Sequence, residues 1–122
     1  MKIDIASRGF ALSPALRERV ETEAGEFQRQ FPQAFQALLV RLSDINGTRG
    51  GPDKGCLIHA RLGRYRISVV ASEIDADLYR AIPAAFLKLE RGVRSALQRQ
   101  RASRRLRRSW LSWSPTGAPV GA

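Results

Sequence analysis

Basic side chains crowd the last third of this 122-residue chain. From Lys88 to Arg108 arginine recurs at short intervals, and the only acidic residue between these two positions is Glu90. A guanidinium group is planar and donates two parallel hydrogen bonds, a geometry that fits the oxygens of a phosphate. Because so many like charges repel one another, an anionic polymer is the simplest partner, and the segment predicts contact with a nucleic acid, RNA in particular.

The candidate RNA-binding residues lie mainly in this basic segment, with a few outside it. A solvated charged face is the alternative interpretation, and it explains most helices of mixed charge, but this segment is hardly mixed. Cations outside the segment are weaker candidates, because each alone is equally well an ordinary surface charge. The full set is Lys88, Arg91, Arg94, Arg99, Arg101, Arg104, Arg105, Arg80, Arg8 and Arg17.

The other residue types that can react or bind metals do not form a recognisable catalytic or metal site. Glu73, Asp75 and Asp77 resemble an acidic metal cluster, but carboxylates just before a helix are better explained as caps that complement its dipole. Cys56 and His59 are the only residues of their kinds, so a zinc site of the usual ligands cannot form, and neither has a visible catalytic partner. We therefore expect neither an enzyme nor a bound cofactor or metal.

The formal net charge of +10 is distributed unevenly. Residues 1–87 carry 12 basic and 10 acidic side chains, whereas residues 88–122 carry nine basic and one acidic. The first ten residues mix charges among apolar positions, unlike a signal peptide, and no apolar run approaches the ~20 residues that cross a bilayer. A single cysteine excludes an intrachain disulfide. We expect a cytoplasmic protein with no membrane partner.

Hydrophobic periodicity predicts six elements. Alternation of apolar and polar residues indicates strands, and spacings of three and four indicate helices. Ser13 followed by Pro14 is a strong helix start, and Pro32 ends that helix. The elements are a strand 2–8, a helix 14–31, strands 36–45, 55–62 and 65–72, and a helix from Asp75 onward. The order predicts a two-layer α+β sandwich of βαβββα type, like a double-stranded-RNA-binding domain, with both helices on one face of a four-stranded sheet.

The last helix is expected to be amphipathic. Leu78, Ile82, Phe86 and further apolar residues fall on one face, while the arginines fall on the other. Beyond Gln100 the apolar periodicity fades, so we expect the helix to fray there. The domain is predicted to span residues 1–105, followed by a flexible tail, 106–122, that is basic and aromatic and then rich in proline and glycine.

Two separated segments resemble the ribosome hibernation promoting factors, also called ribosome-associated inhibitors, of the sigma-54 modulation protein family. The first is Ile5-Ala6-Ser7-Arg8 followed by Ser13-Pro14-Ala15-Leu16-Arg17. The second is Asp77-Leu78-Tyr79-Arg80-Ala81-Ile82 followed by Lys88-Leu89-Glu90-Arg91. The resemblance extends from residue 1 to about residue 100, in the order and context of that family.

The resemblance implies a βαβββα domain that lodges in the decoding groove of the small ribosomal subunit. There it would contact ribosomal RNA and overlap the sites of messenger and transfer RNA, in stress or stationary phase, without chemistry and without a small-molecule substrate. The chain is similar to short members, which lack the C-terminal domain through which long members pair ribosomes. Whether it promotes or prevents such pairing is not fixed by the sequence. We expect the free protein to be a monomer.

The sequence departs from the family at two places. Pro83 stands where an acidic residue is usual, and it predicts a kink or an irregular first turn in the last helix. The tail from Arg104 to Trp113 is basic and aromatic, unlike the extension of some short members. Trp110 and Trp113 would either stack on unpaired bases or pack on protein, and both interpretations stay open.

Three other functions would also fit parts of the sequence. A general structured-RNA-binding module shares the topology, but it contacts phosphates partly through basic residues at the start of its second helix, where this chain has Asp75 and Asp77. A nuclease would need a base, a nucleophile or metal ligands that the sequence does not supply. Membrane-surface binding would need an apolar helix face, which we expect the sheet to cover.

Overall fold

The computed structural model describes residues 2–31, 37–44, 53–63 and 67–112. Strands and helices follow one another in the predicted order, and the predicted α+β class is confirmed. The elements are β1 (Lys2–Arg8), α1 (Pro14–Gln30), β2 (Ala37–Asp44), β3 (Lys54–Leu62), β4 (Ile67–Asp75) and α2 (Leu78–Ser112). The connections at residues 45–52 and 64–66 lie outside the described residues.

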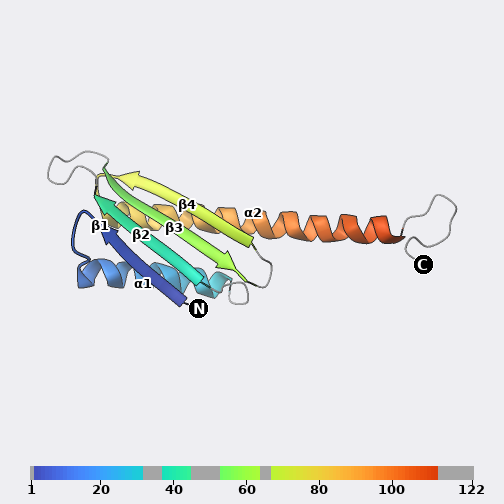
Figure 1. Cartoon of the computed structure of the whole chain (residues 1–122), viewed down its shortest axis with the longest axis horizontal. Coiled ribbons are helices and arrows are strands. Elements are labelled where there is room, and N and C mark those ends of the chain that lie inside the picture. Colours follow the sequence, from blue (N-terminus) through green and yellow to red (C-terminus); the bar gives the residue numbers. More distant parts are fainter. Residues whose placement is uncertain (1, 32–36, 45–52, 64–66, 113–122) are drawn as a thin grey trace.

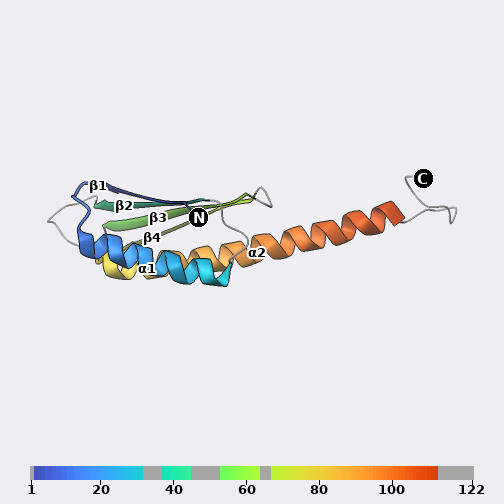
Figure 2. The same cartoon turned by 90° about the horizontal axis from the view of Figure 1, so that it is seen from below.

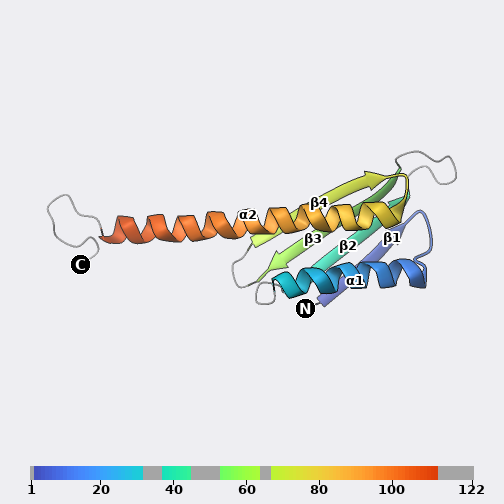
Figure 3. The ribbon, with the colours of Figure 1, turned by 180° about the vertical axis from the view of Figure 1, so that it is seen from behind.

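The four strands form one mixed sheet in the order β1-β2-β3-β4 (Figure 1). β1 runs parallel to β2, because α1 connects them, and the other two pairs are antiparallel. Both helices cover the same face of the sheet, and the other face is open (Figure 2). Seen from behind, α1 and α2 lie side by side across the strands (Figure 3). The predicted two-layer sandwich is thus confirmed.

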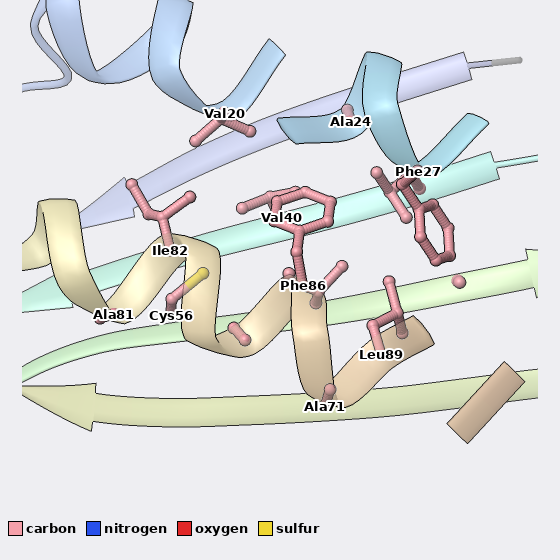
Figure 4. Packing of buried hydrophobic residues seen from close by; sticks show 14 of the residues in the cluster. Val20, Ala24, Phe27, Val40, Cys56, Ala71, Ala81, Ile82, Phe86 and Leu89 are labelled. Carbon is pink, nitrogen blue, oxygen red and sulfur yellow. The ribbon is translucent and has the colours of Figure 1, made fainter. Parts of the chain in front are cut away.

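The core lies between the sheet and the two helices. Alternate strand residues such as Val40 and Ile58 point to the helices and are fully buried. They belong to one buried cluster with Val20 of α1 and the aromatic rings of Phe27 and Phe86, one from each helix, and Figure 4 shows Val40 beside these rings. The two ring centroids are 6.1 Å apart in an edge-to-face arrangement, which joins the helices to each other as well as to the sheet.

At the start of each helix a side-chain oxygen caps a free backbone amide, as the residue types predict. The hydroxyl of Ser13 accepts a hydrogen bond from the amide of Leu16 at 3.2 Å, and Pro14 is the first helical residue. At α2, Oδ1 of Asp77 accepts from the amide of Tyr79 at 3.0 Å. Capping is therefore confirmed for Asp77, whereas Glu73 and Asp75 belong to β4, and Asp75 accepts a hydrogen bond from the amide of Asp77 instead.

α2 is longer than the sequence predicted. It begins at Leu78, because β4 extends to Asp75, and it continues to Ser112 instead of fraying after Gln100. The prediction of fraying there is wrong because apolar periodicity reports which residues are buried, not which are helical. Arginine, alanine and leucine all favour a helix in the absence of packing, and no proline follows Pro83 within it. Residues 113–122 of the predicted tail lie outside the described residues.

Pro83 does not interrupt the helix. α2 is continuous through this residue, and its first turn is closed by hydrogen bonds from the amides of Arg80 and Ala81 to the carbonyl of Asp77. The predicted irregular first turn is therefore wrong. Proline at this position leaves the carbonyl of Tyr79 without its helical partner, and Tyr79 is 46% exposed, so water reaches this turn.

Candidate nucleic-acid interface

α2 consists of two parts with different surroundings. Up to Ala96 one side of the helix is buried against β3, β4 and α1. Beyond it, only Leu97 and Gln100 of the described side chains are half-buried, and the helix projects away from the domain (Figures 1 and 2). We call residues 98–112 the helix extension. The two parts present cations in different ways, because the first is packed on the domain along its length, whereas the described side chains of the second are exposed from Arg101 onward.

Three arginines of the packed part form its outward face. Arg80, Arg91 and Arg94 are exposed, and they lie on the side opposite buried residues such as Phe86 and Leu89. Within the part of the chain that the structure describes, no salt bridge joins any of the three to a carboxylate. Their charges are therefore available to an external anion. We call Arg80, Arg91 and Arg94 the outer arginines.

Lys88 is placed differently from the outer arginines. Its Nζ lies 2.7 Å from Oε2 of Glu73 and donates a hydrogen bond to the carbonyl oxygen of Ser72 at 3.3 Å. Both partners belong to β4, so the ammonium group fastens the edge of α2 to the sheet. Of the predicted RNA-binding residues with described side chains, Lys88 is the one whose charge is paired within the chain.

Arg94 is held by neutral groups from the end of α1. Its Nη2 donates to Oε1 of Gln30 at 2.7 Å, and its guanidinium carbon lies 5.9 Å from the centre of the Phe31 ring. The amide nitrogen of Gln30 in turn donates to Oε1 of Glu90 at 2.9 Å. Arg94 is thereby oriented without being neutralised, and it keeps further N–H groups for a ligand.

The helix extension exposes its cations to solvent. Arg99, Arg101 and Arg105 are all exposed, and so are the neighbouring described residues Gln98 and Leu106. The helix backbone includes Arg104, whose side chain lies outside the described residues. Of the described side chains beyond Ala96, Leu97 and Gln100 are half-buried and the others are exposed. From Arg101 onward every described side chain is exposed, so this part of the helix extension is open to another molecule.

Two predicted residues lie away from α2. Arg17 is exposed on α1, and Arg8 is exposed at the end of β1 on the open face of the sheet. Sequence reasoning did not single out Arg41 and Arg61, which are exposed on that same open face in β2 and β3. Strand alternation was the available signal, because both arginines have the parity opposite to the buried residues. The structure thus separates Arg8 from the outer arginines by the thickness of the sheet.

Cys56 and the residue types that bind metals are the remaining groups that sequence analysis considered for chemistry. Burial raises the pKa of the Cys56 thiol to about 12, so the thiol is protonated at neutral pH. Among the described residues no group of three or more histidine, cysteine or acidic side chains is positioned to hold a metal ion. Over the same residues, no helix is both long and apolar enough to cross a bilayer.

Comparison with known proteins identifies the family. Residues 3–101 match the model of the sigma 54 modulation protein / S30EA ribosomal protein family, a family of ribosome-associated proteins. The chain belongs to this family. The resemblance stated from sequence is confirmed, and the matched range includes both helices up to Arg101. No curated protein matches the chain significantly.

Solved structures of similar proteins show the same fold. The chain is 27% identical to the N-terminal domain of Thermus thermophilus Protein Y, with a TM-score of 0.60, over 74% of this chain and 92% of that one. It is 21% identical to a ribosomal subunit interface protein from Coxiella burnetii, with a TM-score of 0.62, over 84% of this chain and 99% of that one. The similarity to the Coxiella burnetii structure supports the fold of this chain.

Proposed function

We propose that this protein is a hibernation factor that binds the small ribosomal subunit through ribosomal RNA. It occupies the decoding groove in the cytoplasm, blocks the sites of messenger and transfer RNA, and acts as a monomer without a small-molecule substrate. The observation that carries the proposal is the surface made by the outer arginines, whose charges no described carboxylate neutralises. Phosphate contacts of this kind supply most of the affinity of RNA-binding proteins.

Membership in a ribosome-associated family supports the choice of partner. The relative from Coxiella burnetii is named a ribosomal subunit interface protein, which supports a position on the face where subunits meet. A folded domain with a long cationic helix inhibits translation simply by occupying a groove that nucleic acids must enter. Inhibition by occupancy needs no catalytic residue.

Cosedimentation with purified subunits tests the proposal. The protein should pellet with small subunits and not with large ones, and increasing salt should release it steeply, since each phosphate contact contributes about −0.7 to −0.9 to the slope of log affinity against log salt. The double variant Arg91→Glu and Arg94→Glu should lose binding and keep its melting temperature. The matched control reverses Arg41 and Arg61 on the open sheet face and should bind nearly normally.

Competition separates the decoding groove from other sites. If the protein shares its site with messenger RNA and transfer RNA, small subunits loaded with these two RNAs should no longer bind the protein. Simultaneous binding of protein, messenger RNA and transfer RNA would contradict the proposed position. Strong binding to large subunits would contradict the proposed partner.

A general structured-RNA-binding module remains the second candidate. It is favoured by the chemistry of the surface, because guanidinium groups accept the phosphates of any RNA. An excess of unrelated duplex RNA decides between the two functions. It should displace a general module from small subunits at equal nucleotide concentration, whereas a ribosome-specific factor should stay bound.

A further inference from the structure

Glu90 and Arg94 are one helical turn apart on α2. A glutamate four residues before a basic residue is the favourable arrangement for an ion pair on a helix, because the two side chains reach toward each other. Glu90 is also the only acidic residue in the basic segment from Lys88 to Arg108. Helical spacing alone would therefore place this carboxylate in an ion pair with Arg94 that offsets its charge.

The structure shows a different arrangement. The side chain of Gln30, from the last turn of α1, lies between the two charged groups. Its amide nitrogen donates to Oε1 of Glu90 at 2.9 Å, and its amide oxygen accepts from Nη2 of Arg94 at 2.7 Å. No salt bridge is formed between Glu90 and Arg94, both of which are described. The amide can adopt only one orientation, since a carboxylate accepts and a guanidinium only donates.

We propose that Gln30 is a positioning residue that keeps Arg94 free for RNA by separating it from Glu90. This inference rests on the proposed function, because it concerns the same cationic surface. Gln30 satisfies each charged neighbour with a neutral partner, so Arg94 retains its full charge and its remaining N–H donors. The Phe31 ring, next along the chain, holds the same guanidinium group from another side.

Gln30, Glu90 and Arg94 contribute little to folding. Both hydrogen bonds lie in an exposed setting, where hydrogen bonds and ion pairs contribute only small net stability. The core that joins α1 to α2 is made instead by Phe27 and Phe86. A substitution at Gln30 therefore changes the local electrostatics of Arg94 and leaves the fold in place.

The decisive variant is Gln30→Ala, assayed for binding to small ribosomal subunits. Without the amide, Glu90 and Arg94 should form a direct ion pair. Affinity should then fall by about three- to ten-fold, and the slope of log affinity against log salt should shrink by about one phosphate contact, about 0.7 to 0.9. The melting temperature should not change. The matched control is Gln28→Ala, an exposed glutamine of the same helix.

Two double variants separate positioning from a merely structural role. Gln30→Ala combined with Glu90→Gln should regain wild-type affinity and salt slope, because the competing carboxylate is gone. Gln30→Ala should have no further effect in an Arg94→Gln background. Failure of Glu90→Gln to restore binding, or an additional loss in the Arg94→Gln background, would overturn the inference.

Nuclear magnetic resonance of the free protein gives a readout that needs no ribosome. The Arg94 guanidinium signal should respond strongly to Glu90→Gln in the Gln30→Ala protein and weakly in the wild type. If Glu90→Gln shifted the Arg94 signal equally in the Gln30→Ala protein and in the wild type, the inference would be overturned. This holds even if the wild type binds small subunits. A wild type that does not bind small subunits would overturn the proposed function, and the arrangement of Gln30 would then have no RNA to serve.

Discussion

Lys88 of α2 and Glu73 of β4 form a salt bridge, with Nζ 2.7 Å from Oε2. Arg91, one turn further along the same helix, has no such partner among the described residues. Two cations that look equivalent in the sequence therefore have different roles. Lys88 holds the helix edge on the sheet, whereas Arg91 faces outward.

Replacing Lys88 by methionine should weaken small-subunit binding less than replacing Arg91 by methionine. The reason is that the charge of Lys88 is already paired, whereas the charge of Arg91 is available to phosphate. The Lys88 side chain is 55% exposed, so its loss should lower the free energy of unfolding by at most about 1 kcal/mol. Salt titrations of binding and denaturant melts measure the two effects. Equal losses of affinity in the two variants would show that the salt bridge with Glu73 does not keep the charge of Lys88 from phosphate.

Alanine at Gly92 should have opposite effects in two backgrounds. A Cβ at this position would lie 2.8 Å from Cγ1 of Val69 on β4, so Gly92→Ala should destabilise the wild type, by about 1 to 2 kcal/mol. In a Val69→Ala background the clash disappears. There Gly92→Ala should stabilise the protein by up to about 1 kcal/mol, because alanine favours a helix more than glycine does. Chemical denaturation of the four proteins tests this prediction. An identical effect in both backgrounds would contradict close packing of α2 on β4.

Cys56 should resist thiol reagents in the folded protein. Its side chain is buried and its pKa is raised to about 12, so a disulfide reagent at pH 8 should react only after unfolding. The raised pKa also affects stability. Its contribution is complete below the ordinary value of 9.0 and is lost as pH rises from there toward about 12. Cys56→Ala should reduce the loss of stability over this range. Rapid labelling of the native protein would contradict the described burial.

Glutamine at Arg99, Arg101 and Arg105 should weaken binding without affecting the fold. These residues are exposed on the helix extension, so the melting temperature should stay constant. The salt slope should fall by about 2 to 3, at about 0.7 to 0.9 for each lost contact. The control substitutes glutamine at Arg41 and Arg61, which lie on the open face of the sheet. An equal effect of the control would mean that net charge alone determines binding.

The sequence was sufficient for the architecture because each element buries one face. Alternation in β2 and β3 and helical spacing in α1 report burial directly, and these elements appear as predicted. The end of α2 was missed because an exposed helix leaves no apolar signal. Glu73 was interpreted as a capping residue because the sequence does not show that β4 continues to Asp75 and brings this carboxylate beside Lys88.

The candidate site was predictable in composition but not in detail. Arginine content identified α2 as the cationic element, and the outer arginines are exposed as expected. Which cations are paired depends on contacts between elements distant in sequence. Gln30 reaches Glu90 and Arg94 across 60 and 64 positions, so no local pattern could indicate its placement.

The 35-residue length of α2, about 50 Å, displaces the centre of positive charge from the centre of mass. A body of this kind has a large electric dipole moment, and it experiences a torque in the field of a polyanion. The projecting arm should therefore turn toward the RNA before the globular part arrives. Because ions screen this field beyond about 8 Å at physiological ionic strength, the rotation happens only in the final approach and shortens the search for a productive encounter.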